Sequence, residues 1–154
     1  MSNILVYTDG SSRGNPGPGG YGVVMISGEH RKELSKGFRK TTNNRMELLS
    51  VIVALESVKD RGHNVLIHSD SKYVVDSVEK KWVFGWAKKE FKGKKNEDLW
   101  RRFLNIFPKH NVKFKWVKGH AGLEENERCD VLAVQAAKGS NLKIDHGFEE
   151  NPSS

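Results

Sequence analysis

Three β-type segments in a row, followed by helical and β-type segments in alternation, constrain the fold of this chain most. Residues 3–9 and 20–27 are rich in β-branched and aromatic side chains, and residues 31–40 follow after a short connection, which predicts an antiparallel meander. Helical and strand patterns then alternate over the ranges 41–62, 64–70, 71–80, 96–107, 112–119 and 123–139. This order predicts an α/β sandwich around a mixed sheet.

The helix expected over residues 41–62 is apolar on almost every face. It opens with Thr and Asn cap candidates and closes with Gly62. A helix without a polar face is typical of one packed between other elements, so we expect this segment to lie inside the fold.

The size of the chain predicts a single domain. Its 154 residues, of which 36% are hydrophobic, are enough for one core. Few apolar side chains follow residue 139, so residues 140–154 are expected to form a mobile tail. No apolar run could span a bilayer and the N-terminus lacks a secretory pattern, which favours a cytoplasmic protein without a membrane partner.

Charge and cysteine content limit the classes of partner and metal site. A formal net charge of +7 favours a polyanionic partner such as a nucleic acid, although many basic proteins bind none. Cys129 is the only cysteine, which excludes an internal disulfide and a zinc site with two thiolates from this chain. A catalytic metal would therefore need oxygen or histidine ligands.

Four carboxylates occupy positions from which they could converge. Asp9 and Asp70 end expected strands, and Glu47 and Asp130 lie within expected helices. Ligand sites of α/β sheets form where strands end and helices begin. Each acid also has a simpler interpretation, because a strand-terminal Asp commonly caps a turn and Glu47 could interact with the positive end of its helix.

The helical neighbours of Glu47 and Asp130 favour the convergent interpretation. Positions i+4 and i+7 from Glu47 are Val51 and Ala54, and Asp130 shares its face with alanine and valine. A carboxylate pressed against an apolar core is unfavourable unless it is paired, and a bound cation is one of few ways to compensate it.

Four motifs in this order resemble bacterial ribonuclease HI, which cleaves the RNA of RNA/DNA hybrids. They are TDGSSRGNPGPGGYG (8–22), TTNNRMELLSVIVAL (41–55), SDSKYV (69–74) and KGHAGLEENERCD (118–130). The resemblance covers roughly residues 3–139. It implies an α/β fold with a five-stranded mixed sheet flanked by helices, a catalytic domain over residues 1–139 and a monomeric protein.

The resemblance also implies a metal-dependent site. Its acidic centre corresponds to Asp9, Glu47, Asp70 and Asp130, which would bind two Mg²⁺ ions, with Mn²⁺ as a substitute, and His120 would act as a loop histidine in proton transfer or product release. Four carboxylates suit hard divalent cations, and two such ions can activate water and stabilise the leaving oxygen. Ser12 and Leu123 stand where some relatives carry cysteine and a second histidine.

Contacts to an RNA/DNA hybrid are expected from two regions. Ser12, Asn15, Asn43 and Asn44 match the minor-groove contacts of the family, although capping and turn chemistry would also explain them. Thr42 and Arg45 are expected phosphate contacts.

The second region is the basic segment, residues 80–95, which contains seven lysines and one acid. It includes the expected contacts Trp82, Trp86, Lys88 and Lys89, and lysines interleaved with exposed rings suit a surface that holds a nucleic-acid strand.

The main hypothesis is an endonuclease that hydrolyses the RNA strand of a hybrid by two-metal-ion catalysis and leaves 5′-phosphate and 3′-hydroxyl ends. One alternative is a hybrid-binding module without catalysis, which predicts a missing carboxylate, whereas all four are present. Another is a DNA strand-transfer enzyme of the same fold, which usually needs additional domains.

Overall fold

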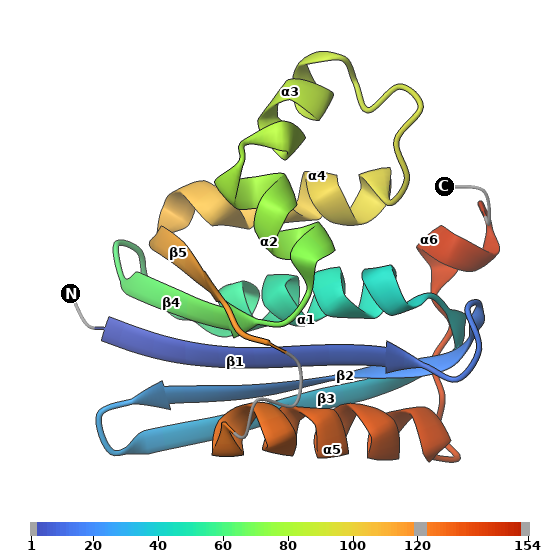
Figure 1. Ribbon diagram of the computed structural model, residues 1–154, viewed down its shortest axis with the longest axis horizontal. Helices are drawn as coiled ribbons and strands as arrows, with labels where there is room; N and C mark the ends of the chain where they lie inside the picture. Colours follow the sequence, from blue (N-terminus) through green and yellow to red (C-terminus); the bar gives the residue numbers. More distant parts are fainter. Residues whose placement is uncertain (1–2, 119–122, 152–154) are drawn as a thin grey trace.

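A five-stranded mixed sheet forms the centre of the computed structural model, which describes residues 3–118 and 123–151 (Figure 1). The spatial order is β3-β2-β1-β4-β5; β1, β2 and β3 are antiparallel neighbours, whereas β4 is parallel to both β1 and β5. The strands are β1 (Asn3–Ser12), β2 (Gly17–Ser27), β3 (His30–Thr41), β4 (Asn64–Ser69) and β5 (Asn111–Trp116). The predicted meander and the predicted mixed sheet are both confirmed.

Helices cover both faces of the sheet. The elements α1 to α4 lie on one side and α5 lies on the other (Figure 1). The helices are α1 (Asn43–Ser57), α2 (Lys72–Glu79), α3 (Trp82–Lys88), α4 (Glu97–Ile106), the short 3-10 helix Phe107–Lys109, α5 (Glu124–Lys138) and α6 (His146–Glu149). Within the described ranges, no helix combines the length and the apolar character needed to cross a membrane.

The central helix α1 is buried as its apolar sequence predicted. Its buried side chains include Leu48, Val51, Ile52 and Leu55, which pack between the sheet and α4. The helix is shorter than the predicted range 41–62, because the chain leaves helical geometry at Val58 and then turns through two residues with positive φ, Asp60 and Gly62. The predicted ranges also lacked α3, which forms within the basic segment.

Two glycines bring the acid-bearing helices close to the sheet. A side chain at Gly10 would collide with the backbone of Met46 and Glu47 in α1, and one at Gly22 would collide with the carbonyl oxygen of Cys129 in α5. Because neither residue has a Cβ, both helices can approach the strands at these two points. The glycine-rich sequence therefore determines how near the helical carboxylates come to Asp9, which pairs with Gly22 across the sheet.

The C-terminal residues differ from the predicted mobile tail. Lys143 exchanges backbone hydrogen bonds with Gly37 and Arg39 at 2.9 Å each, and Asp145 and Phe148 are buried. Regular structure thus continues beyond residue 139 to the end of α6 at Glu149, and the boundary of the catalytic domain at residue 139 stays a prediction. Among the apolar side chains of this segment, Phe148 is buried whereas Ile144 is 40% exposed, so backbone hydrogen bonds and the buried Asp145 contribute to the attachment as well. Residues 152–154 lie outside the described residues.

Candidate active site

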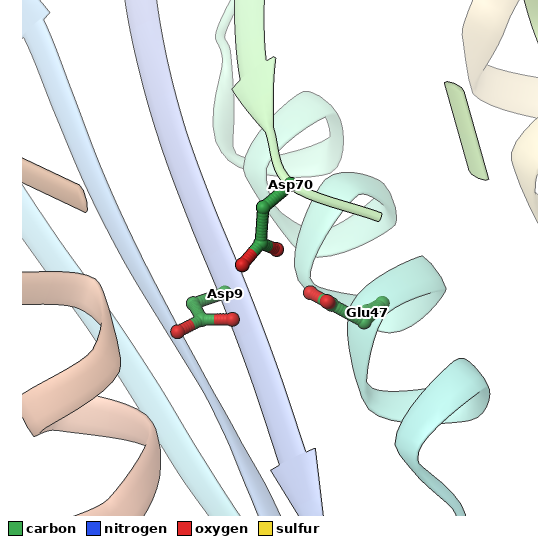
Figure 2. A group of neighbouring side chains, drawn as sticks. All are labelled: Asp9, Glu47 and Asp70. Carbon is green, nitrogen blue, oxygen red and sulfur yellow. The ribbon is translucent and has the colours of Figure 1, made fainter. Parts of the chain in front are cut away.

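Three of the four predicted carboxylates converge at one point of the sheet (Figure 2). Asp9 comes from β1, Asp70 directly follows the parallel neighbour β4, and Glu47 comes from the second turn of α1. Each residue offers one carboxylate oxygen, and these oxygens all lie within 4.8 Å of one another. Asp9 is 38 positions from Glu47 and 61 positions from Asp70 in the sequence, so the fold brings acids from distant parts of the chain into one cluster.

Burial makes this cluster electrostatically unfavourable without a counter-charge. Glu47 is only 6% exposed, and burial followed by the charges of Asp9 and Asp70 raises its pKa well above the usual value. Burial also raises the pKa of Asp9 to about 8, reinforced by Asp70 and Asp130 and opposed by the hydrogen bond from the Gly10 N–H. These directions are those expected for like charges held together away from water.

Asp130 lies beside the cluster rather than within the group of three. It is partly buried on α5, and its carboxyl contacts that of Asp9 closely enough to raise the pKa of Asp9 by charge and by a hydrogen bond. The fourth predicted acid therefore approaches from the opposite face of the sheet. His120 lies outside the described residues, so its predicted role remains a prediction.

The predicted minor-groove residues gather where the loop after β1 meets the start of α1. The Asn43 N–H donates to Asn15 Oδ1 at 3.1 Å, and Thr42 caps the helix by accepting from the Arg45 N–H at 3.2 Å. Asn43 and Asn44 are exposed, and the capping role belongs to Thr42. Ser12 is partly buried at the end of β1.

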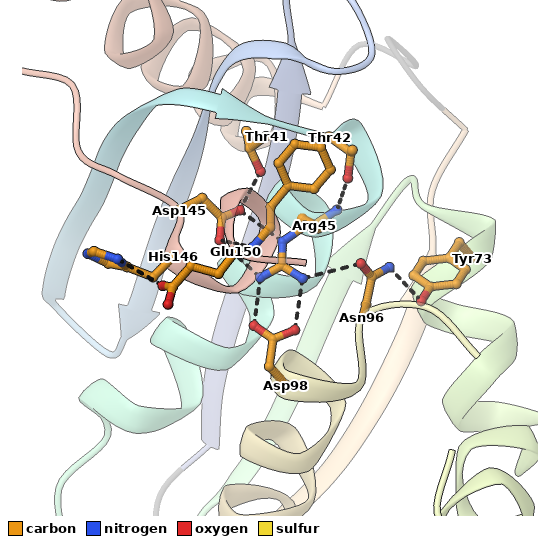
Figure 3. Close-up of polar contacts among 10 residues, drawn as sticks. Thr41, Thr42, Arg45, Tyr73, Asn96, Asp98, Asp145, His146 and Glu150 are labelled. Atoms are coloured by element: carbon orange, nitrogen blue, oxygen red, sulfur yellow. Dashed lines mark hydrogen bonds and ion pairs between the residues drawn. The ribbon is translucent and has the colours of Figure 1, made fainter. Parts of the chain in front are cut away.

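Arg45 does not occupy the position expected of a phosphate contact. Its side chain is 1% exposed, and all of its donors are engaged with Asn96, Asp98 and Asp145 (Figure 3). Burial lowers the pKa of Arg45, but its bonds with Asp98 and Asp145 more than compensate, so the guanidinium stays charged. The predicted contact is therefore corrected, because a fully paired internal arginine has no donor left for substrate. Its place in an otherwise apolar helix was the signal that it would be buried and paired.

The basic segment presents fewer exposed rings than its sequence suggested. Trp82 is 46% exposed, whereas Phe91 is 3% exposed and Trp86 packs edge-on against Trp100 with ring centroids 6.1 Å apart. Lys88 and Lys89 are exposed at the end of α3.

A hollow of about 340 Å³ separates this segment from the start of α1. Trp82, Trp86 and Lys94 line it together with Asn44 and with Tyr73, a residue not among the predicted substrate contacts. Two groups of expected substrate contacts therefore face one space.

A family model described as RNase H matches residues 1–138 of this chain. The chain belongs to the ribonuclease H family. Ribonuclease H of Desulforamulus reducens is 57% identical over 150 residues, which cover 94% of each chain. Ribonuclease H of Shewanella amazonensis is 53% identical over 154 residues, which cover 97% of each chain.

Solved structures of ribonuclease H proteins share the fold. LC9-RNase H1, a type 1 RNase H with the type 2 active-site motif, gives a TM-score of 0.82 at 35% identity, covering 100% of this chain and 82% of the other. LC11-RNase H1, solved in complex with an RNA/DNA hybrid, gives a TM-score of 0.59 at 27% identity, covering 88% of this chain and 96% of the other.

The donor set of this ribonuclease H site fits a divalent cation. Glu47 Oε1 and Asp70 Oδ1 are buried and have no hydrogen-bond partner among the described residues. A buried carboxylate oxygen without a hydrogen bond is unfavourable in a protein interior. Such oxygens are suitable ligands for a hard divalent cation, which would compensate their charge. Asp9, Glu47 and Asp70 could therefore hold a metal ion, with Asp130 beside them.

The two tryptophans of the basic segment are expected to respond differently to replacement by alanine. Trp82→Ala should weaken hybrid binding by about 1–3 kcal/mol, the range for a ring that stacks on a base, with little change in melting temperature. Trp86→Ala should mainly destabilise the fold, by on the order of 2 kcal/mol, because it leaves a void against Trp100. Melting curves and hybrid KM for both variants test this, and a large loss of stability in Trp82→Ala would contradict it.

Proposed function

We propose that this protein is an endonuclease that hydrolyses the RNA strand of RNA/DNA hybrids and leaves 5′-phosphate and 3′-hydroxyl ends. The observation that carries the proposal is the convergence of Asp9, Glu47 and Asp70, with two orphaned oxygens, in a chain of the ribonuclease H family. The structure of LC11-RNase H1 with a hybrid supports the substrate class.

Mg²⁺ is the proposed cofactor, with two ions during catalysis and Mn²⁺ as a substitute. Divalent ions bound at the cluster would activate a water molecule and neutralise charge on the phosphate and on the leaving 3′ oxygen. The charges of both Asp70 and Asp130 raise the pKa of Asp9, so the three carboxylates are near neighbours and Asp9 could bind an ion together with either of the other two. Burial of Glu47 excludes water from its side of the cluster and strengthens its attraction for a cation.

The remaining residues would bind and orient the hybrid. Asn15, Asn43 and Asn44 offer small amide groups suited to base edges and 2′-hydroxyls of a minor groove. The exposed lysines of the basic segment would bind backbone phosphates of the same duplex across the hollow. The monomeric state and cytoplasmic location remain predictions from the sequence.

A cleavage assay with labelled duplexes tests the proposed function. RNA/DNA, RNA/RNA and DNA/DNA duplexes of one sequence are incubated with Mg²⁺, with Mn²⁺ or with EDTA, and the ends of the products are analysed. We expect cleavage of the RNA strand of the hybrid only, in either metal and not in EDTA. Binding of the hybrid without cleavage in either metal would favour the silent binding module, and joining of DNA strands would favour the strand-transfer alternative.

Lysines of the basic segment are expected to act through charge alone. The variant changes five exposed residues to Gln: Lys88, Lys89, Lys92, Lys94 and Lys95. It should raise hybrid KM and leave kcat largely intact. Each lost phosphate contact should reduce the slope of log affinity against log salt by roughly 0.7–0.9. Cleavage measured at several salt concentrations checks this, and an unchanged slope would exclude the segment from hybrid binding.

A further inference from the structure

Arg45 is the centre of a buried polar network (Figure 3). Asp145 accepts hydrogen bonds from Arg45 Nε and Nη2 at 2.8 and 3.0 Å, and Asp98 accepts from Nη1 and Nη2 at 2.9 and 2.7 Å. Asn96 Oδ1 lies 3.4 Å from Nη1 and accepts the fifth N–H. Two bidentate carboxylates on one guanidinium fix its orientation more firmly than a single ion pair would.

The C-terminal segment, residues 143–149, supplies one of the two carboxylates of this network, which accepts two of the five hydrogen bonds from the guanidinium. Asp145 is 7% exposed, accepts a hydrogen bond from Thr41 Oγ1 at 2.6 Å and caps α6. Gly147 lies so close that a Cβ there would overlap Asp98 Oδ2 and lie 2.7 Å from Arg45 Nη2. The segment is therefore fitted around the guanidinium by both charge and shape.

The other side of the network reaches elements that carry the active site. Arg45 lies in the first turn of α1, after the exposed Asn43 and Asn44 and before the buried Glu47. Asn96 Nδ2 donates to the hydroxyl of Tyr73 at 3.0 Å, and Tyr73 follows Asp70 by three positions and lines the hollow.

We propose that Arg45 is a positioning residue for hybrid binding, through which the C-terminal segment holds the first turn of α1 in place. This inference rests on the proposed function, because Asn43 and Asn44 are taken to contact the hybrid. An internal guanidinium needs its carboxylates, so the first turn of α1 cannot move away from residues 143–149 without leaving a buried charge unpaired. Weakening that attachment frees the turn and misplaces both asparagines, and small displacements of binding groups reduce affinity strongly.

Two variants of the C-terminal segment test the proposal. Asp145→Asn removes one charge from the network, whereas Gly147→Ala keeps every charge but pushes Asp98 and Arg45 apart. Glu149→Gln is the matched control, because it removes only the exposed ion pair with Arg39 from the same segment. Fluorescence anisotropy with a labelled RNA/DNA hybrid in EDTA gives Kd without catalysis, and steady-state cleavage gives KM and kcat.

We expect Kd and KM to rise about tenfold in both variants, with kcat within about threefold of the starting protein and Glu149→Gln unchanged. Amide hydrogen exchange of residues 43–46 should accelerate in both variants and not in the control. Arg45→Lys should show the same defect, because an ammonium cannot hold two carboxylates in bidentate geometry.

Unchanged Kd and KM at a temperature where the variants are folded would overturn the proposal, even if melting temperatures fall. A loss of kcat alone would overturn it as well. If Asp145→Asn does not fold, Gly147→Ala and Asp98→Asn decide the outcome by the same measurements. A starting protein that neither binds nor cleaves the hybrid would instead contradict the proposed function.

Discussion

Asp70→Asn is expected to abolish hybrid cleavage while hybrid binding persists. Asp70 Oδ1 is one of the two buried carboxylate oxygens for which no described residue supplies a hydrogen bond, and replacing the carboxylate by an amide removes an anionic ligand from the cluster. Metal-assisted stabilisation of a transition state amounts to several kcal/mol, so the rate should fall by at least about 10³-fold. Binding should change little, because most affinity for nucleic acid comes from phosphate contacts elsewhere.

Asp76→Asn is the matched control for this experiment. Asp76 lies on the neighbouring helix α2, where it forms an ion pair of 3.7 Å with Lys80 at the surface. Single-turnover cleavage and hybrid Kd are measured for both variants at the same Mg²⁺ concentration. Near-normal turnover in a folded Asp70→Asn protein would contradict the assignment of Asp70 as a metal ligand.

Asp9→Asn is expected to stabilise the metal-free protein at neutral and higher pH. The pKa of Asp9 is raised from 3.8 to about 8 in the folded state, so between these values the folded protein binds a proton that the unfolded chain releases. Stability contributed by this group is fully present below pH 3.8 and is lost as pH rises through about 8. Asn has no carboxyl group to ionise, so the variant does not lose stability in this way. Its free energy of unfolding at pH 8 should exceed that of the starting protein by on the order of several kcal/mol.

Denaturant unfolding in EDTA between pH 5 and pH 8 measures the effect. The difference in free energy of unfolding between Asp9→Asn and the starting protein should shrink as the pH falls. Asparagine keeps an acceptor for the Gly10 N–H, so the change isolates the charge. Mg²⁺ should raise the melting temperature of the starting protein more than that of the variant, since only a cluster with all its acids binds the ion tightly. A variant less stable than the starting protein at every pH would contradict the idea of repulsion among the acids.

Much of this fold and its acidic site could be predicted from the sequence, because local patterns report burial. Alternating and continuous apolar segments identified all five strands, and the apolar character of α1 predicted its central position. Asp9, Asp70 and Glu47 were recognisable from their places at strand ends and on an apolar helix face, together with the four family motifs. These features depend on residues close together in the chain.

Only the tertiary structure decided which polar residues face substrate and which face one another. Arg45 and Glu47 lie two positions apart on α1, yet one is neutralised by Asp145, 100 residues away, and the other is left with an orphaned oxygen. The same holds for the basic segment, where contact with Trp100 buries part of Trp86 and leaves Trp82 exposed. A periodic pattern gives the burial of a side chain but not the identity of its partner, because that partner is brought near by the packing of elements distant in sequence.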